Sequence, residues 1–191
     1  MLFIDNKAAK KLWNYLGIGR HDYPPNRVEQ GGLFAGFRLS ETAAVVTLVI
    51  PADHYTAQTS GYVEWSGLED IYMRRKIREY KSELAKINPE MAHKFEILGW
   101  FHSHPNQLPV FMSRTDRATQ TEKYPDSFAL VVNPHTMIWK AYWGASCKEI
   151  PVIMPVPATD SLQSVRQKHQ KMRKTKYGLP RGGKKKRKGR R

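Results

Sequence analysis

Two histidines separated by a single residue, His102 and His104, stand at the end of an apolar run in the stretch GWFHSHPNQLPVFMSRTD, residues 99–116. In a β-strand, residues i and i+2 point to the same face, so the two imidazoles would project side by side, about 7 Å apart along the chain. Side chains placed in this way could bind one metal ion. Catalytic zinc sites usually take three protein ligands and a water, so a third ligand is needed.

Asp116 is the best candidate for the third ligand. Ser113 precedes it by three residues at an expected helix start, and the loop before this helix could return the carboxylate to the strand end. The same S-x-x-D spacing is close to a capping box, in which Ser113 caps the helix and Asp116 stabilises its first turn. The two interpretations are compatible. A lone histidine is more often a packed or hydrogen-bonded residue than a ligand, so the metal prediction depends on the combined pattern.

The combination HSHP and SRTD resembles the JAMM zinc metalloproteases, also called MPN-plus or JAB domains, a family that includes deubiquitinases. The family pattern begins with a glutamate in an early strand, and the segment VEQGGLFAGF supplies Glu29 at that place. The resemblance covers about residues 1–155. Eight residues separate His104 from Ser113 here, where the family usually has seven. We expect the loop, which contains Pro109, to absorb the extra residue.

This resemblance implies a zinc metalloprotease with one catalytic Zn²⁺ held by His102, His104 and Asp116. It also implies that Glu29 is the general base and that Ser113 donates a hydrogen bond to the oxyanion, without a covalent intermediate. Glu29 precedes an apolar strand, an awkward place for a charge without a partner. The alternative for Glu29 is an exposed residue at the entry to a strand.

The substrates implied by the resemblance are ubiquitin or ubiquitin-like proteins and their conjugates. Such an isopeptidase cuts after the carboxyl-terminal glycine, for deconjugation or precursor processing, and we expect a prokaryotic ubiquitin-like conjugation or sulfur-carrier pathway. An extended tail can add as a strand to a sheet edge. Residues 55–65 and 85–95 are the candidate segments for that contact.

Other protein classes fit the sequence less well. A zinc deaminase needs H-x-E and a P-C-x-x-C pair, and a gluzincin needs H-E-x-x-H; the chain has neither and contains one cysteine. Cys147 lacks an activating context for a nucleophile, so a structural thiol is expected. The alternatives to a hydrolase are a non-catalytic MPN scaffold and a nucleic-acid-binding adaptor that acts through the basic tail.

The charge of the chain is concentrated at its carboxyl-terminal end. The net charge is +15, and residues 161–191 carry 14 of the 32 Lys and Arg with no Asp or Glu, so the first 160 residues are nearly neutral. We expect a JAMM catalytic domain at residues 1–158 and a basic, disordered tail at residues 159–191. The functional interpretation of the tail is a polyanion contact through residues 166–191.

The single cysteine and the lack of a recognisable signal segment favour a cytoplasmic location. The most apolar stretch, residues 43–52, is shorter than the roughly 20 residues that span a bilayer, so no membrane contact is expected.

The elements that position the candidate site follow from periodicity and turn residues. Apolar residues recur at steps of four and three between residues 69 and 87, which is typical of one buried helix face. They are Met73, Ile77, Tyr80, Leu84 and Ile87. The order of elements predicts an α/β domain with a mixed, mostly antiparallel sheet flanked by helices, and the resemblance implies the cytidine-deaminase-like MPN/JAB1 fold. Helices are predicted in residues 6–16, 69–87 and 113–124, and strands in residues 3–5, 31–39, 43–52, 94–102 and 127–143, the last range holding two strands joined at a turn.

Overall fold

The computed structural model describes residues 1–17, 28–106 and 108–156. The predicted tail at residues 159–191 and most of the loop before Glu29 lie outside these residues, so the tail and the boundary at residue 158 stay predictions. Among the described residues, no helix is long and apolar enough to cross a membrane.

The centre of the domain is an eight-stranded sheet with the strand order β10-β1-β3-β2-β6-β7-β8-β9. Three neighbouring pairs are parallel (β1 with β10, β1 with β3, β6 with β7), and the remaining four are antiparallel. The mixed, mostly antiparallel sheet predicted from the sequence is therefore confirmed. The strands are β1 (Leu2–Ile4), β2 (Gly31–Ser40), β3 (Ala43–Pro51), β6 (Phe95–Ser103), β7 (Phe128–Asn133), β8 (Ile138–Trp143), β9 (Lys148–Ile150) and β10 (Val152–Ile153).

Four helices and a small hairpin complete the described part of the domain. The predicted helices are confirmed, and the structure adds a short helix and a separate two-stranded sheet that the sequence analysis did not anticipate. The elements are α1 (Asn6–Leu16), α2 (Gly67–Ile87), α3 (Pro89–Lys94) and α4 (Arg114–Lys123), with β4 (Tyr55–Gln58) and β5 (Val63–Trp65) in the hairpin.

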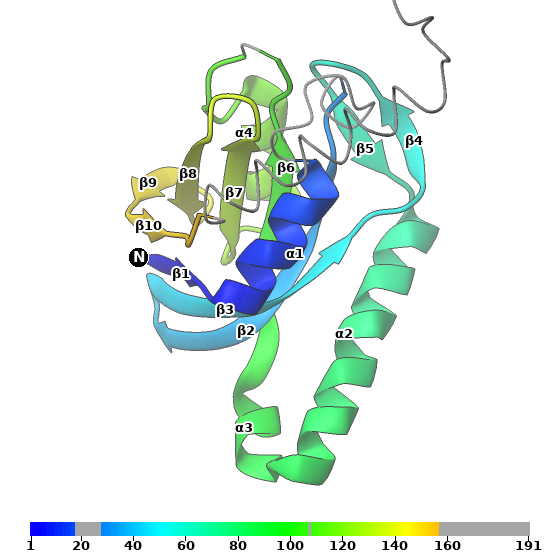
Figure 1. Cartoon of the computed structure of the whole chain (residues 1–191), viewed down its shortest axis with the longest axis vertical. Helices are drawn as coiled ribbons and strands as arrows, with labels where there is room; N and C mark the ends of the chain where they lie inside the picture. Colours follow the sequence, from blue (N-terminus) through cyan, green and yellow to red (C-terminus); the bar gives the residue numbers. More distant parts are fainter. Residues whose placement is uncertain (18–27, 107, 157–191) are drawn as a thin grey trace, which may run out of the picture. The chain divides into compact units, whose positions relative to one another are not determined.

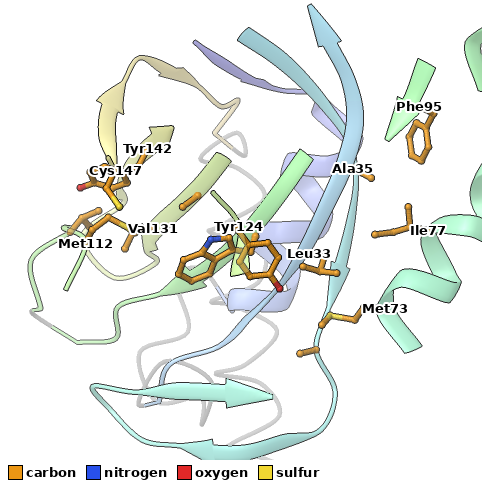
Figure 2. Packing of buried hydrophobic residues seen from close by; sticks show 14 residues of the cluster. Leu33, Ala35, Met73, Ile77, Phe95, Met112, Tyr124, Val131, Tyr142 and Cys147 are labelled. Atoms are coloured by element: carbon orange, nitrogen blue, oxygen red, sulfur yellow. The ribbon is translucent and has the colours of Figure 1, made fainter. Parts of the chain in front are cut away.

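Helices cover both faces of the sheet (Figure 1). On one face, Trp13 of α1 packs edge-on against Trp139 of β8, with ring centroids 5.4 Å apart. On the other face, Met73 and Ile77 of α2 belong to the same buried cluster as Leu33 of β2 (Figure 2). The sheet is thus the middle layer of an α/β sandwich, and each of its faces buries apolar surface.

One residue of the predicted buried face of α2 is exposed. Met73 and Ile77 are buried as expected, whereas the side chain of Ile87 is 84% exposed. Ile87 is the last residue of the helix, where α2 runs beyond the sheet towards α3 (Figure 1). The helical period continues to that point, but no strand lies beneath it, so this part of the prediction was wrong.

Gly99 gives β6 an irregular step just before the two histidines. Phe34 of β2 pairs with Gly99 and Ala35 pairs with Ile97, so one residue of β6 bulges out of the register. Gly99 has φ +157°, and a Cβ there would lie 1.8 Å from the Phe128 carbonyl oxygen of β7. Glycine is therefore required where β6 begins to pair with β7.

Candidate metal centre

His102 and His104 extend from the end of β6 towards the same side of the sheet. The side chains are 1% and 4% exposed, and their Nε2 atoms lie 3.2 Å apart. Trp100, two residues earlier on the same face, stacks on the ring of His102 with centroids 5.2 Å apart and planes 14° from parallel. The alternation of a strand thus places two imidazole nitrogens next to each other beside an aromatic wall.

Asp116 reaches this histidine pair from the first turn of α4. Ser113 is the N-cap: its Oγ accepts the Asp116 N–H at 3.2 Å, and Asp116 Oδ2 accepts the Ser113 N–H at 2.7 Å. The predicted capping box is therefore present. The same Oδ2 lies 3.4 Å from His102 Nε2, so capping the helix and facing the histidines are compatible roles for this carboxylate.

The electrostatics of the site favour an ionised aspartate and neutral histidine. Burial disfavours the charge of Asp116, but hydrogen bonds and charge interactions with His102 and Ser113 outweigh it and hold the pKa of Asp116 well below its usual range. Burial and the neighbouring His102 lower the pKa of His104. Carboxylate and neutral imidazole are the protonation states that bind metal ions.

The tautomer of His104 follows from its hydrogen-bond partner. Its Nδ1 lies 2.5 Å from the Pro109 carbonyl oxygen, and because a carbonyl can only accept, Nδ1 must carry the proton. The lone pair of His104 is then on Nε2, which faces His102. The buried Nδ1 of His102, by contrast, has no hydrogen-bond partner among the described residues.

The two distances from His102 to the other candidate ligands fit a tetrahedral ion. Two ligand atoms bound to one zinc at about 2.0–2.1 Å would lie about 3.3 Å apart at a tetrahedral angle. The two Nε2 atoms are 3.2 Å apart, and His102 Nε2 is 3.4 Å from Asp116 Oδ2. All three ligand atoms lie within 4.8 Å of one another. The cluster could therefore hold a metal ion and leave a fourth position for water.

Glu29 lies beside this cluster at the entry to β2. Gly31 of β2 pairs with His102, and Ser103 N–H donates to the Gln30 carbonyl at 2.8 Å. Continuing this antiparallel register by one residue places Glu29 opposite His104. Glu29 is 5% exposed, which contradicts its interpretation as a surface residue.

The pKa of Glu29 is raised to about 7, because burial disfavours its charge and Asp116 repels it, while the attraction of His102 acts in the opposite direction. The backbone at this position is held by the hairpin: Glu29 N–H donates to the Thr59 carbonyl at 2.7 Å, and Gln58 Nε2 donates to the Glu29 carbonyl at 2.9 Å. A carboxyl group that titrates near neutral pH is thus fixed in place next to the histidines.

These polar groups open into one cavity of about 210 Å³. Glu29, His104, Ser113 and Asp116 are among the residues that line it. The hairpin and the loop before α4 contribute apolar walls, made by Tyr62, Val63, Trp65, Leu108 and Phe111. A candidate metal site with an adjacent carboxyl group therefore faces an apolar pocket of the kind that binds a ligand.

Sequence reasoning missed three parts of this site. The β4–β5 hairpin forms a wall of the cavity, although residues 55–65 were proposed only as a substrate contact. Gln120 is fully buried between Trp100 and the end of α4, and Asn133 is fully buried at the end of β7. No local pattern marks either amide as buried, because their partners are distant in the chain.

The fold and the site define an α/β domain with a candidate His-His-Asp metal centre. The model of the JAB1/Mov34/MPN/PAD-1 ubiquitin protease family matches residues 25–124, a range that includes the three candidate ligands, Glu29 and Ser113. This is more than half of the chain, and the protein belongs to this family.

Among solved structures, the chain is similar to a JAB1/MPN domain protein from Archaeoglobus fulgidus, with 14% sequence identity and a TM-score of 0.42. That match covers 80% of this chain and 97% of the other. No curated protein matches the sequence.

Proposed function

We propose that this protein is a zinc-dependent isopeptidase or peptidase that cuts after the carboxyl-terminal glycine of ubiquitin or a ubiquitin-like protein. The observation that carries the proposal is the meeting of His102, His104 and Asp116 beside the buried carboxyl group of Glu29. A non-catalytic scaffold needs neither the ligands nor the carboxyl group.

The three candidate ligands fit a zinc ion in number and type, and the distances from His102 Nε2 to His104 Nε2 and Asp116 Oδ2 fit its spacing. When bound, zinc would supply a Lewis acid that lowers the pKa of a water and polarises the scissile carbonyl. A side chain of the protein would transfer the proton. With a pKa raised to about 7, Glu29 could accept a proton at its carboxylate from the attacking water and donate it to the leaving amine nitrogen.

In this proposal, Ser113 would act on the substrate oxygen. Its Oγ already accepts the Asp116 N–H, so its own hydroxyl proton is available for another acceptor. Ser113 lines the same cavity as Glu29. A hydrogen bond from this hydroxyl to the developing oxyanion would stabilise the transition state by about 3 kcal/mol in a comparable site.

The lining of the cavity supports contact between the substrate tail and the hairpin. Its aromatic walls come from the β4–β5 hairpin and the loop before α4. Of the two segments proposed for substrate contact, residues 55–65 contribute cavity walls, whereas none of residues 85–95 is among the described residues that line the cavity. We therefore place the substrate tail along the hairpin.

The test is hydrolysis of fusions in which a ubiquitin-like protein is joined through its last glycine to a reporter. We expect wild-type protein loaded with zinc to cleave such a fusion, and Glu29→Gln to lose at least about 100-fold in rate. Glu122→Gln, on the exposed side of α4, is the matched control. Equal cleavage by wild type and Glu29→Gln would contradict the mechanism.

Metal content tests the zinc assignment separately. After metal-free purification and addition of zinc, we expect about one equivalent per chain. A content below about half an equivalent would favour the scaffold.

A contact between the basic tail and a polyanion is an independent proposal. Residues 161–191 hold 14 Lys or Arg without an acidic residue, so nucleic acid is the natural probe. Deletion of residues 159–191 should abolish binding to nucleic acid and leave hydrolysis unchanged. Binding that survives the deletion would rule out the tail.

A further inference from the structure

Asn133, the last residue of β7, is completely buried and uses its whole side-chain amide. Its Oδ1 accepts the backbone N–H groups of His135 and Thr136 at 2.8 and 3.0 Å. Its Nδ2 donates to the carbonyl oxygens of Asn106 and Leu108 at 3.1 and 2.7 Å. These partners fix the orientation of the amide. If the amide were flipped, its oxygen would face two carbonyl oxygens and its NH₂ group would face two backbone N–H groups, so all four hydrogen bonds would be lost.

These bonds join two segments with different roles. The accepted bonds close the turn that follows β7, as an asparagine side chain commonly does. The donated bonds hold the loop between the candidate ligands His104 and Asp116. Asn106 in this loop has φ +57°, a left-handed conformation that asparagine tolerates better than most residues.

The loop carries the acceptor that sets the tautomer of His104. The Leu108 carbonyl, held by Asn133, belongs to the planar peptide unit that ends at the Cα of Pro109. The proline ring then fixes φ of Pro109 near −65°. With the peptide plane and φ both fixed, the direction of the Pro109 carbonyl depends on a single torsion angle, and this carbonyl accepts the proton of His104 Nδ1 at 2.5 Å.

The same strand end also holds the backbone of His104, whose N–H donates to the Val132 carbonyl at 2.9 Å. Val132 and Asn133 are adjacent, so the main chain of His104 and the acceptor of its side chain are fixed by two neighbouring residues of β7. His102 has no comparable hydrogen bond from Nδ1 to a described residue. The loop therefore matters for one of the two histidines.

We propose that Asn133 is a positioning residue of the metal centre, which acts through Leu108 and Pro109 to keep the lone pair of His104 on Nε2. The metal role of His104 in this inference rests on the proposed function. Partners that orient a metal-ligating histidine typically change metal affinity by about 10- to 100-fold when they are removed.

Asn133→Ser is the informative variant, because serine can still accept a hydrogen bond within the turn but cannot donate to both loop carbonyls. Pro109→Ala is a second variant at an exposed position, which frees φ of residue 109 and leaves Asn133 intact. Asn88→Ala is the control: it removes an asparagine that caps α3 by accepting the Met91 N–H at 3.0 Å and lies outside the site.

The first readout is the imidazole tautomer in metal-free protein, measured by long-range ¹⁵N–¹H correlation spectra. In wild type and in Asn88→Ala, we expect His104 to be in the Nδ1–H form. In Asn133→Ser and Pro109→Ala, we expect the Nδ1–H form of His104 no longer to predominate. The second readout is the affinity for Co²⁺, followed by its absorption bands. We expect Asn133→Ser to bind about 10- to 100-fold more weakly than wild type, and Asn88→Ala to bind within twofold.

An unchanged tautomer and an unchanged Co²⁺ affinity in folded Asn133→Ser would overturn the positioning role. If Asn133→Ser does not fold, an unchanged tautomer in Pro109→Ala overturns it. Failure of wild type to bind either Zn²⁺ or Co²⁺ would instead overturn the proposed function, and the tautomer comparison would still decide whether Asn133 controls His104.

Discussion

Trp100 and Gln120 are joined by a buried hydrogen bond of 2.7 Å, from the indole Nε1 to the amide Oε1. Trp100 lies two residues before His102 on β6, and Gln120 lies one helical turn after Asp116 on α4. The bond therefore ties the strand that carries His102 and ends just before His104 to the helix that carries Asp116. Gln120 Nε2 also donates to the Tyr124 and Ser127 carbonyls at 2.7 and 2.8 Å, so the contact fixes the end of α4.

Gln120→Leu should destabilise the protein by about 2–4 kcal/mol, because it leaves an indole N–H and two carbonyl groups without their buried partner. The free energy of unfolding in urea measures this loss. Glu122→Gln, at an exposed position of α4, should change it by no more than about 0.5 kcal/mol. Equal effects of the two substitutions would show that the bond does not hold β6 and α4 together.

Asp116→Asn should separate the two roles of this residue. An asparagine oxygen can still accept the Ser113 N–H that Asp116 accepts at 2.7 Å, so the helix should keep its cap. The loss of a charged ligand should weaken Zn²⁺ binding by at least about 100-fold, as measured by competition with a chelator. Asp126→Asn, at an exposed position, is the control. Retained zinc affinity in Asp116→Asn would remove Asp116 from the ligand set.

The pKa of Glu29 predicts an unusual pH dependence of stability. Its folded value is about 7, against an ordinary value of 4.5. Between these values the folded protein binds more protons than the unfolded chain, so this group lowers stability as the pH rises from about 4.5 to 7. In zinc-free protein, Glu29→Gln should therefore be more stable than wild type above pH 7, by about 1–2 kcal/mol after allowance for solvent screening.

Urea denaturation at pH 5 and pH 8 in the presence of a chelator measures this effect. The difference between Glu29→Gln and wild type should grow from pH 5 to pH 8, whereas Glu122→Gln should show no such growth. If the free energies of unfolding of Glu29→Gln and wild type differ by the same amount at both pH values, burial does not raise the pKa of Glu29.

Local patterns in the sequence were enough to predict the parts of the site that lie within one element. The alternation of β6 placed His102 and His104 on one face, and the S-x-x-D spacing predicted the cap of α4 that carries Asp116. Both signals are short-range, because they depend on the geometry of a strand and of a helical turn.

The remaining parts of the site depend on contacts between distant segments. The hairpin β4–β5 contains only a few strand residues, and it is held against Glu29 by the bond from Glu29 N–H to the Thr59 carbonyl. The burial of Gln120 is decided by Trp100 on another element. The exposure of Ile87 has the same origin: periodicity shows which face of a helix is apolar, but not where the covering sheet ends.

Gly31→Ala tests the close contact between β2, β6 and the hairpin beside Glu29. A Cβ at Gly31 would lie 2.8 Å from the Phe101 carbonyl oxygen and 2.8 Å from Cζ3 of Trp65. The backbone oxygen cannot move without shifting β6, and the indole is a rigid wall of the cavity. We expect a loss of about 1–3 kcal/mol in the free energy of unfolding, with a higher KM for the fusion substrate because Trp65 is displaced. Gly67→Ala is the control, because a Cβ there meets nothing within 4 Å. Alanine also favours the first turn of α2 more than glycine does. The free energy of unfolding of this variant should therefore be unchanged or rise by up to about 1 kcal/mol. If both variants matched wild type in stability and KM, the hairpin would be free to move away from β2, and the Trp65 wall would not shape the cavity.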